Sequence, residues 1–220
     1  EGEDIAKELN SWGVTAFVLK YRLPNDTTMQ VKSIAPLQDA QRAIQLVREN
    51  AAQWNVDPQK IGIMGFSAGG HLASTLSTHY RETRIENPHG TSLRPDFSIL
   101  IYPVISFTDS MAHKGSRNRL LGSNPTPEEI LNFSNELQIN ANTPPAFLVH
   151  ASDDATVPVQ NSLAYYSALL NNRVPAEMHI YEKGGHGFGL NNRTTTDKWQ
   201  ERLRNWMLSR KLLAVPEVTD

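Results

Sequence analysis

Short apolar runs alternate with stretches that repeat apolar residues at helical spacing along most of the chain. The runs are rich in β-branched and aromatic residues, which is typical of strands buried inside a sheet. They predict strands at 14–21, 61–66, 97–102, 146–150 and 177–181. The helical repeats predict helices at 3–12, 40–54, 67–79, 158–170 and 195–210. Strands that alternate with helices indicate an α/β fold, with a mostly parallel sheet that carries helices on both faces.

One stretch interrupts this alternation. Residues 106–143 are interrupted often by Gly, Ser, Asn and Pro, and they predict only short helical pieces, such as 127–133. We interpret the stretch as an insertion, or cap, over an edge of the sheet. A length of 220 residues suffices for one α/β domain with a sizeable core. We therefore predict a single domain over residues 1–220 with a cap at about 106–143.

Composition and charge narrow the possible functions. Hydrophobic residues make up 39% and charged residues 20% of the chain, which is ordinary for a globular domain. A net charge of −2 without any basic block gives no reason to expect nucleic acid as a partner. The absence of cysteine excludes disulfides, thiolate metal sites and a cysteine nucleophile. No apolar run reaches membrane-spanning length, and without a His-Glu-x-x-His motif or a carboxylate cluster we expect neither metal nor cofactor.

The pattern Gly-x-Ser-x-Gly at 65–69 joins a predicted strand directly to a predicted helix. Strand, sharp turn and helix in this order are what a nucleophile elbow requires, with Ser67 held in strained backbone geometry above the end of the sheet. We expect Gly65 and Gly69 to be required because a Cβ at either position would clash with a neighbouring element. The backbone N–H of Ala68 is a candidate donor to an oxyanion. The competing interpretation is a glycine-rich turn without chemistry.

An aspartate pair and a histidine follow two of the later predicted strands. Asp153 and Asp154 come just after the strand 146–150, and His186 just after 177–181. The order Ser…Asp…His, each at the carboxyl end of a strand, is that of α/β-hydrolases. A serine hydroxyl needs a base to take its proton, histidine titrates near neutrality, and an acid orients the imidazole. Either aspartate satisfies this pattern.

Three other histidines receive structural interpretations. His71 lies one helical turn after the serine, where we expect a packing or hydrogen-bonding residue rather than a catalytic one. His150 ends a predicted strand and is expected to hold the acid loop. His113 lies in the insertion, where contact with substrate is the alternative to a solvated surface position.

Nearly the whole chain resembles one branch of the α/β-hydrolase superfamily, the bacterial esterases related to carbohydrate acetylesterases and to acetylxylan or feruloyl esterases. Six segments carry the resemblance: 17–24, 65–73, 102–106, 120–122, 143–145 and 184–189. It implies a serine esterase that removes acetyl or other small acyl groups from carbohydrate, and it favours a secreted or periplasmic location. Because the insertion leaves the sheet at the carboxyl end of a strand, we expect it to cover the serine and to shape the acyl and sugar sites.

The resemblance selects between the two aspartates. In many α/β-hydrolases the acid lies four residues after a strand-ending histidine and three before the valine of a Val-Pro pair. His150, Asp154, Val157 and Pro158 match this spacing, whereas Asp153 comes one residue too early. The resemblance therefore implies a Ser67, Asp154 and His186 triad.

One departure from the family concerns the start of the chain. Family members carry a strand and a Gly-rich loop ahead of the helix predicted at 3–12, and the loop supplies part of the oxyanion hole. That strand lies between the strands corresponding to 14–21 and 61–66. We therefore expect a longer protein, in which upstream residues or a neighbouring chain fill the gap. Otherwise, 14–21 is expected to pair directly with 61–66.

Two alternatives to a carbohydrate esterase remain open. A prolyl-oligopeptidase-like serine peptidase uses the same Ser…Asp…His order, although no propeller repeat precedes the domain here. A non-catalytic remnant that retained the fold without the activity belongs to a different class. Cleavage of ester against anilide substrates distinguishes the two enzymes, and labelling by a fluorophosphonate distinguishes either enzyme from the remnant.

Overall fold

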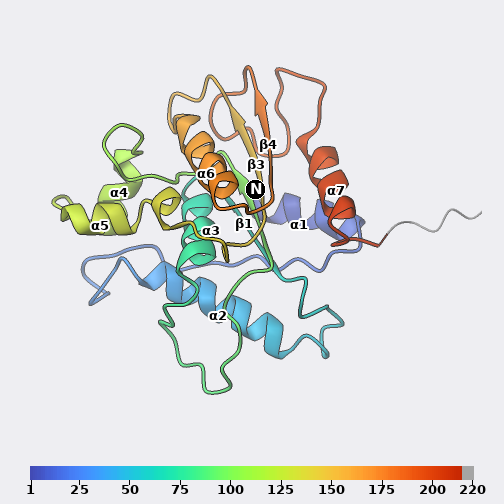
Figure 1. Cartoon of the computed structure of the whole chain (residues 1–220), viewed down its shortest axis with the longest axis horizontal. Helices are drawn as coiled ribbons and strands as arrows, with labels where there is room; N and C mark the ends of the chain where they lie inside the picture. Colours follow the sequence, from blue (N-terminus) through green and yellow to red (C-terminus); the bar gives the residue numbers. More distant parts are fainter. Residues whose placement is uncertain (215–220) are drawn as a thin grey trace, which may run out of the picture.

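A four-stranded parallel sheet forms the centre of the computed structural model, which describes residues 1–214 (Figure 1). The strand order is β1-β2-β3-β4, so the chain adds each new strand beside the last. The strands are β1 (Gly62–Phe66), β2 (Phe97–Ile101), β3 (Ala146–Ala151) and β4 (Ala176–Tyr181). The helices are α1 (Gly2–Ser11), α2 (Ala35–Glu49), α3 (Ser67–His79), α4 (Lys114–Leu121), α5 (Pro127–Asn132), a 3₁₀ turn η1 (Asn135–Gln138), α6 (Gln160–Asn171) and α7 (Trp199–Ser209).

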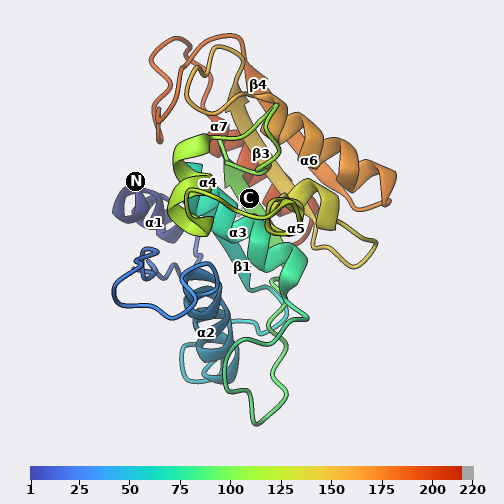
Figure 2. The same ribbon diagram turned by 90° about the vertical axis from the view of Figure 1, so that its left-hand side faces the viewer.

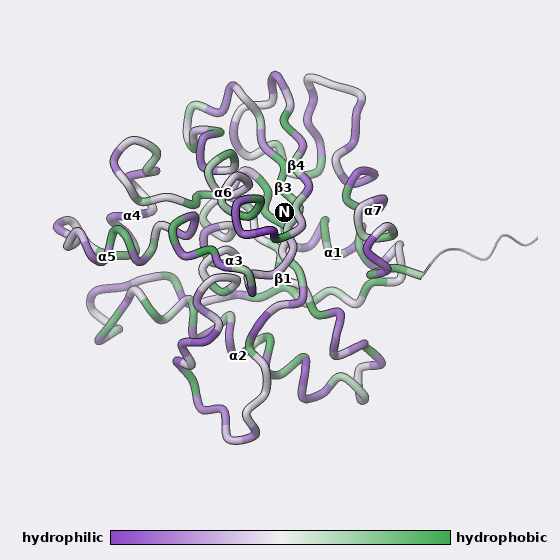
Figure 3. The backbone as a smooth tube through the Cα atoms, in the orientation of Figure 1, coloured by the Kyte–Doolittle hydropathy of each residue, from purple (hydrophilic) through white to green (hydrophobic). Residues whose placement is uncertain are grey.

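Side chains that alternate along the central strands divide the core into two layers. Ile99 and Ile101 of β2 face α1 and α7, while Leu100 between them faces α3 and α6. Helices therefore cover both faces of the sheet, as predicted, with α3 and α6 on one side and α1 and α7 on the other (Figures 1 and 2). The alternation follows from the two-residue period of a strand. Hydrophobic positions gather along the central strands, whereas the outer loops are mostly hydrophilic (Figure 3).

Two predicted helices begin later than expected. Predicted from residue 195, α7 starts at Trp199, because the Thr195 hydroxyl accepts the N–H of Asp197 at 3.1 Å and closes a turn instead. Threonine hydroxyls that bond nearby backbone groups in this way offer the chain an alternative to a helical turn. The other helix, α6, is predicted from Pro158 but starts at Gln160.

None of the helices within residues 1–214 combines the length and the apolar character of a membrane span.

The strand predicted at 14–21 does not form. These residues are not assigned to any strand, and they pair neither with β1 nor with another described segment. Phe17 and Val18 are 52% and 62% exposed, and the ring of Phe17 rests against Trp54 at a centroid distance of 4.9 Å. The expectation that 14–21 would otherwise pair with the elbow strand is therefore wrong. An apolar, β-branched run favours extended backbone, but a strand also requires a hydrogen-bonded neighbour, which periodicity does not report.

An apolar cluster anchors the insertion. Buried with Val104 and Val157 are two residues of the insertion, Phe107 and Phe133. Between them lie α4 and α5, the second of which has a capping box in which Thr126 and Glu129 bond each other's backbone. The short helical piece predicted at 127–133 thus forms. His113 caps α4 by accepting the Ser116 N–H at 3.3 Å, which is a structural position.

Candidate active site

Ser67 lies at the turn between β1 and α3, and its backbone φ is +50°. A non-glycine residue in this region costs about 1–3 kcal/mol and persists only where the surroundings impose it. Gly65 is part of that constraint, because a Cβ there would lie 2.1 Å from the carbonyl oxygen of Gly69. The strained strand-turn-helix predicted from Gly-x-Ser-x-Gly is confirmed by this geometry.

The prediction for Gly69 is wrong, because a Cβ on Gly69 would meet no atom within 4 Å. The next residue, Gly70, has the tight contact instead. A Cβ on Gly70 would lie 2.6 Å from Cβ and 2.9 Å from Cα of Pro103. The close approach is therefore between α3 and the segment that follows β2, which local sequence around the serine does not indicate.

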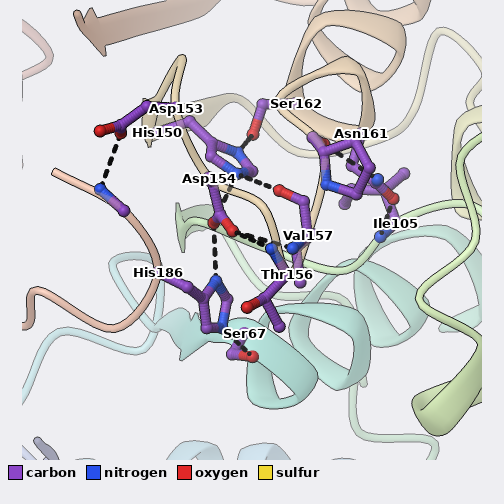
Figure 4. A network of polar contacts seen from close by, with 12 residues as sticks. Ser67, Ile105, His150, Asp153, Asp154, Thr156, Val157, Asn161, Ser162 and His186 are labelled. Carbon is purple, nitrogen blue, oxygen red and sulfur yellow. Dashed lines mark hydrogen bonds and ion pairs between the residues drawn. The ribbon is translucent and has the colours of Figure 1, made fainter. Parts of the chain in front are cut away.

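Three side chains from three strand ends meet at this turn (Figure 4). The Oγ of Ser67 lies 2.8 Å from Nε2 of His186, and Nδ1 of the same ring lies 2.6 Å from Oδ2 of Asp154. The His186 side chain is 19% exposed and that of Asp154 is fully buried. Ala68 is exposed in the first turn of α3, where a backbone N–H has no hydrogen-bond partner within the helix.

Asp154 is held as a carboxylate by several donors. Burial acts to raise the pKa of Asp154, but the Val157 N–H, His186 and the Thr156 N–H outweigh it and keep the pKa below its ordinary range. Both backbone donors reach Oδ1 at 2.9 Å, which leaves Oδ2 for the imidazole. His150 supports the same loop: its Nε2 donates to the Val157 carbonyl at 3.0 Å and lies 3.2 Å from Oδ2. The expectation that His150 holds the acid loop is confirmed.

Asp153 contacts the histidine loop rather than the imidazole. Its Oδ1 accepts the Gly185 N–H at 2.7 Å, one residue before His186. The loop needs such anchors because Gly185, Gly187 and Gly189 all have positive φ values, at 62°, 79° and 54°. Glycine adopts these conformations at little steric cost but leaves the backbone free to move.

Asn161 and Tyr102 are two residues at the site that the sequence did not single out. The buried Asn161 carbonyl accepts the N–H groups of Ile105 and Ser106 at 2.9 Å, and its amide donates to the carbonyls of Met111 and Pro158. It thereby links the start of the insertion to the helix after the acid loop (Figure 4). A single asparagine in an apolar helix carries no motif, so only the fold reveals this link. Tyr102 is buried directly after β2 with a φ of +36°.

Two hollows lie beside the site. One, of about 140 Å³, lies between α3, the insertion and residues 21–37, and its mainly apolar lining includes Ala68, Leu72, Leu120 and Phe133. The other, of about 640 Å³, lies between α1 and the loop after His186. Within residues 1–214, no cluster of three or more histidine and carboxylate side chains is arranged to hold a metal ion.

His71 connects α3 to the insertion in an uncharged form. Its Nε2 donates to the carbonyl of Phe133 at 2.9 Å, and its ring stacks on Phe107 at 4.3 Å. Burial lowers the pKa of His71 to about 4, against the opposing effect of the Phe133 carbonyl and with a further lowering from His79. This confirms the expectation that His71 is a packing and hydrogen-bonding residue.

Stability should therefore fall in weak acid. The unfolded chain takes up a proton on His71 below about pH 6.5, whereas the folded chain resists it down to about pH 4. The free energy of unfolding should then decrease as pH falls across this window, by up to about 3 kcal/mol from this residue alone. Urea unfolding of His71→Gln should show a shallower pH dependence, while His89→Gln, on an exposed loop, should keep that of the wild type. Equal pH dependence in all three proteins would contradict the assignment.

Four parallel strands with helices on both faces and a serine on the turn after β1 define an α/β-hydrolase. The crystal structure of an acetyl ester-xyloside bifunctional hydrolase from Caldicellulosiruptor lactoaceticus superposes with a TM-score of 0.87 at 42% identity, over 97% of this chain and 78% of that one. The chain belongs to the BD-FAE family, whose model matches residues 2–169. It lies in the carbohydrate-esterase branch of the superfamily, as the sequence resemblance implied.

Two curated relatives are similar over nearly the whole chain. Endo-1,4-beta-xylanase B of Butyrivibrio fibrisolvens is 40% identical over 90% of this chain and 31% of its own length. The acetylxylan esterase of Xylanibacter ruminicola is 39% identical over 95% of this chain and 42% of its own length. The chain thus spans less than half the length of these two relatives.

Proposed function

We propose that the chain is the catalytic part of a serine carboxylic-ester hydrolase that removes acetyl or other small acyl groups from carbohydrate. The observation that supports it most is the continuous contact from Ser67 Oγ through His186 to Asp154, at 2.8 and 2.6 Å. A hydroxyl, a base and a buried carboxylate in this line are what acyl transfer to serine requires.

In this proposal Ser67 Oγ attacks the carbonyl carbon of the ester while Nε2 of His186 takes its proton. Asp154 keeps the proton on Nδ1, so that Nε2 is free to accept, and stabilises the imidazolium that forms. The oxyanion develops toward the N–H of Ala68, at the positive end of α3. His186 then protonates the leaving alcohol, and a water molecule deprotonated by His186 hydrolyses the acyl-serine.

Support for a small acyl group comes from two sources. The similar proteins include an acetylxylan esterase and an acetyl ester-xyloside bifunctional hydrolase. The hollow of about 140 Å³ that Ala68 lines is small and mainly apolar, which suits a short acyl chain. The insertion that borders it takes the role of a cap in this proposal, within a single domain.

Hydrolysis rates on a matched substrate set test this function. We expect release of acetate from acetylated xylan and cleavage of p-nitrophenyl acetate, with p-nitrophenyl octanoate cleaved at least tenfold more slowly in kcat/KM. Prolyl and alanyl p-nitroanilides should remain intact. Preference for the octanoate would contradict the small-acyl proposal, preferential anilide cleavage would favour the peptidase, and inactivity on every substrate would favour the non-catalytic remnant.

A further inference from the structure

Residues 102–104, directly after β2, contact both the serine turn and the histidine loop. The Val104 N–H donates to the carbonyl of Ser67 at 3.0 Å, and Pro103 packs against Gly70 so closely that no Cβ fits between them. The Tyr102 N–H donates to the carbonyl of Val149 at 2.7 Å, which extends the pairing of β2 with β3 by one residue. One short segment that continues a central strand therefore holds the backbone of the serine turn.

The same segment reaches the histidine loop through the side chain of Tyr102. Its hydroxyl accepts the Gly189 N–H at 3.0 Å and donates to the Glu1 carboxylate at 2.7 Å. Its ring meets those of His186 and Phe188 edge to face, at centroid distances of 5.1 and 4.7 Å. The side chain of Tyr102 therefore contacts both the His186 imidazole and the backbone of Gly189, three residues later.

The backbone of Tyr102 is unusual in a way that this contact explains. Its φ is +36°, although it is a bulky residue and precedes Pro103, which favours extended backbone at the preceding position. The side chain is fully buried despite this conformation. Backbone in such regions persists only where neighbouring contacts impose it, and it often occurs at functional sites. Here, the turn directs the phenol from the end of β2 toward the histidine loop.

We propose that Tyr102 is a positioning residue that fixes the His186 imidazole against Ser67, by clamping the loop at Gly189 while Asp153 holds it at Gly185. The two anchors lie on either side of His186, in a loop whose glycines would otherwise leave it free to move. Because residues 102–104 also hold the serine turn, the distance between Oγ and Nε2 is set through a single rigid segment. The inference rests on the proposed role of His186 as the base.

Loss of the clamp should lower kcat rather than weaken substrate binding. In Tyr102→Phe the ring remains but both hydrogen bonds of the hydroxyl are lost, so we expect kcat to fall about tenfold with KM within twofold of wild type. Glu1→Gln replaces the charged acceptor by a neutral amide at an exposed position, and we expect a fall of about threefold. Tyr181→Phe is the matched control, because its hydroxyl also donates to a carboxylate, Asp197 at 2.8 Å. We expect that control to keep the wild-type kcat.

A spectroscopic readout separates positioning from activity. The His186 Nδ1–H that donates to Asp154 should give a far-downfield proton NMR signal, present in wild type and Tyr181→Phe and broadened or lost in Tyr102→Phe. An unchanged signal together with unchanged kcat in both variants would overturn the proposal, as would a rise in KM alone. An equal effect in Tyr181→Phe would also overturn it. If Tyr102→Phe fails to fold, hydrogen exchange of the Gly189 N–H in the wild-type protein decides: slow exchange supports the clamp, and exchange as fast as that of an exposed loop amide overturns it. An inactive wild type would instead count against the proposed function, and the signal would still report on the clamp.

Discussion

Replacing Ser67 with alanine is expected to lower kcat for p-nitrophenyl acetate by about 10⁴- to 10⁶-fold, because no other group in the site can form the acyl intermediate. The fold should persist, since alanine has no larger side chain and the strain of a φ of +50° is the same for both residues. Circular dichroism and a thermal melt check this directly.

Ser77→Ala is the matched control for this substitution. Ser77 lies on the same helix, fully buried, and its hydroxyl donates to the Ala73 carbonyl at 2.8 Å without facing the site. Alanine suits a helix interior, so we expect near wild-type kcat. If Ser67→Ala kept more than about a hundredth of the wild-type rate, Ser67 would not be the nucleophile.

The second large effect concerns the two neighbouring aspartates. Asp154→Asn should lower kcat by about 10⁴-fold, because an amide nitrogen facing Nδ1 of His186 favours the tautomer in which Nε2 carries the proton and cannot accept another. The Asn oxygen can still accept the Thr156 and Val157 N–H groups that Oδ1 accepts now, so the loop should hold.

Asp153→Asn provides the comparison at the adjacent position. Asp153 is exposed and bonds Gly185 rather than the imidazole, and an Asn oxygen can accept the same N–H. We expect kcat within about threefold of wild type. A greater loss in Asp153→Asn than in Asp154→Asn, measured on folded proteins, would reverse the assignment of the acid.

Those parts of the fold that depend on local pattern could be predicted from the sequence. β1 and α3 follow from an apolar run and a helical repeat joined at Gly-x-Ser-x-Gly, and the pattern also predicts the strained φ of Ser67. Ser67, Asp154 and His186 could be named because each follows a strand, and parallel strands deliver their carboxyl ends to one edge. The choice of Asp154 over Asp153 needed family spacing, since both residues directly follow the strand predicted at 146–150.

Structural features that depend on contacts between residues distant in the sequence could not be predicted. The run at 14–21 has the composition of a strand, but it pairs with no strand among residues 1–214. Gly70, not Gly69, contacts a facing segment, because that segment comes from the end of β2 more than thirty residues later. The hydroxyl of Tyr102 accepts a hydrogen bond from Gly189, which lies far along the chain, and no periodicity or motif indicates such a contact.

Covalent labelling tests the central claim, that Ser67 is an activated nucleophile, most directly. Treatment of the folded chain with a fluorophosphonate, followed by trypsin and mass spectrometry, examines the peptide 61–81, which contains Ser67, Ser74 and Ser77. We predict a single adduct, located on Ser67 by fragmentation, that disappears when the chain is unfolded before treatment and is strongly reduced in Asp154→Asn. No adduct on the folded chain, or an adduct on a different serine, would contradict the claim.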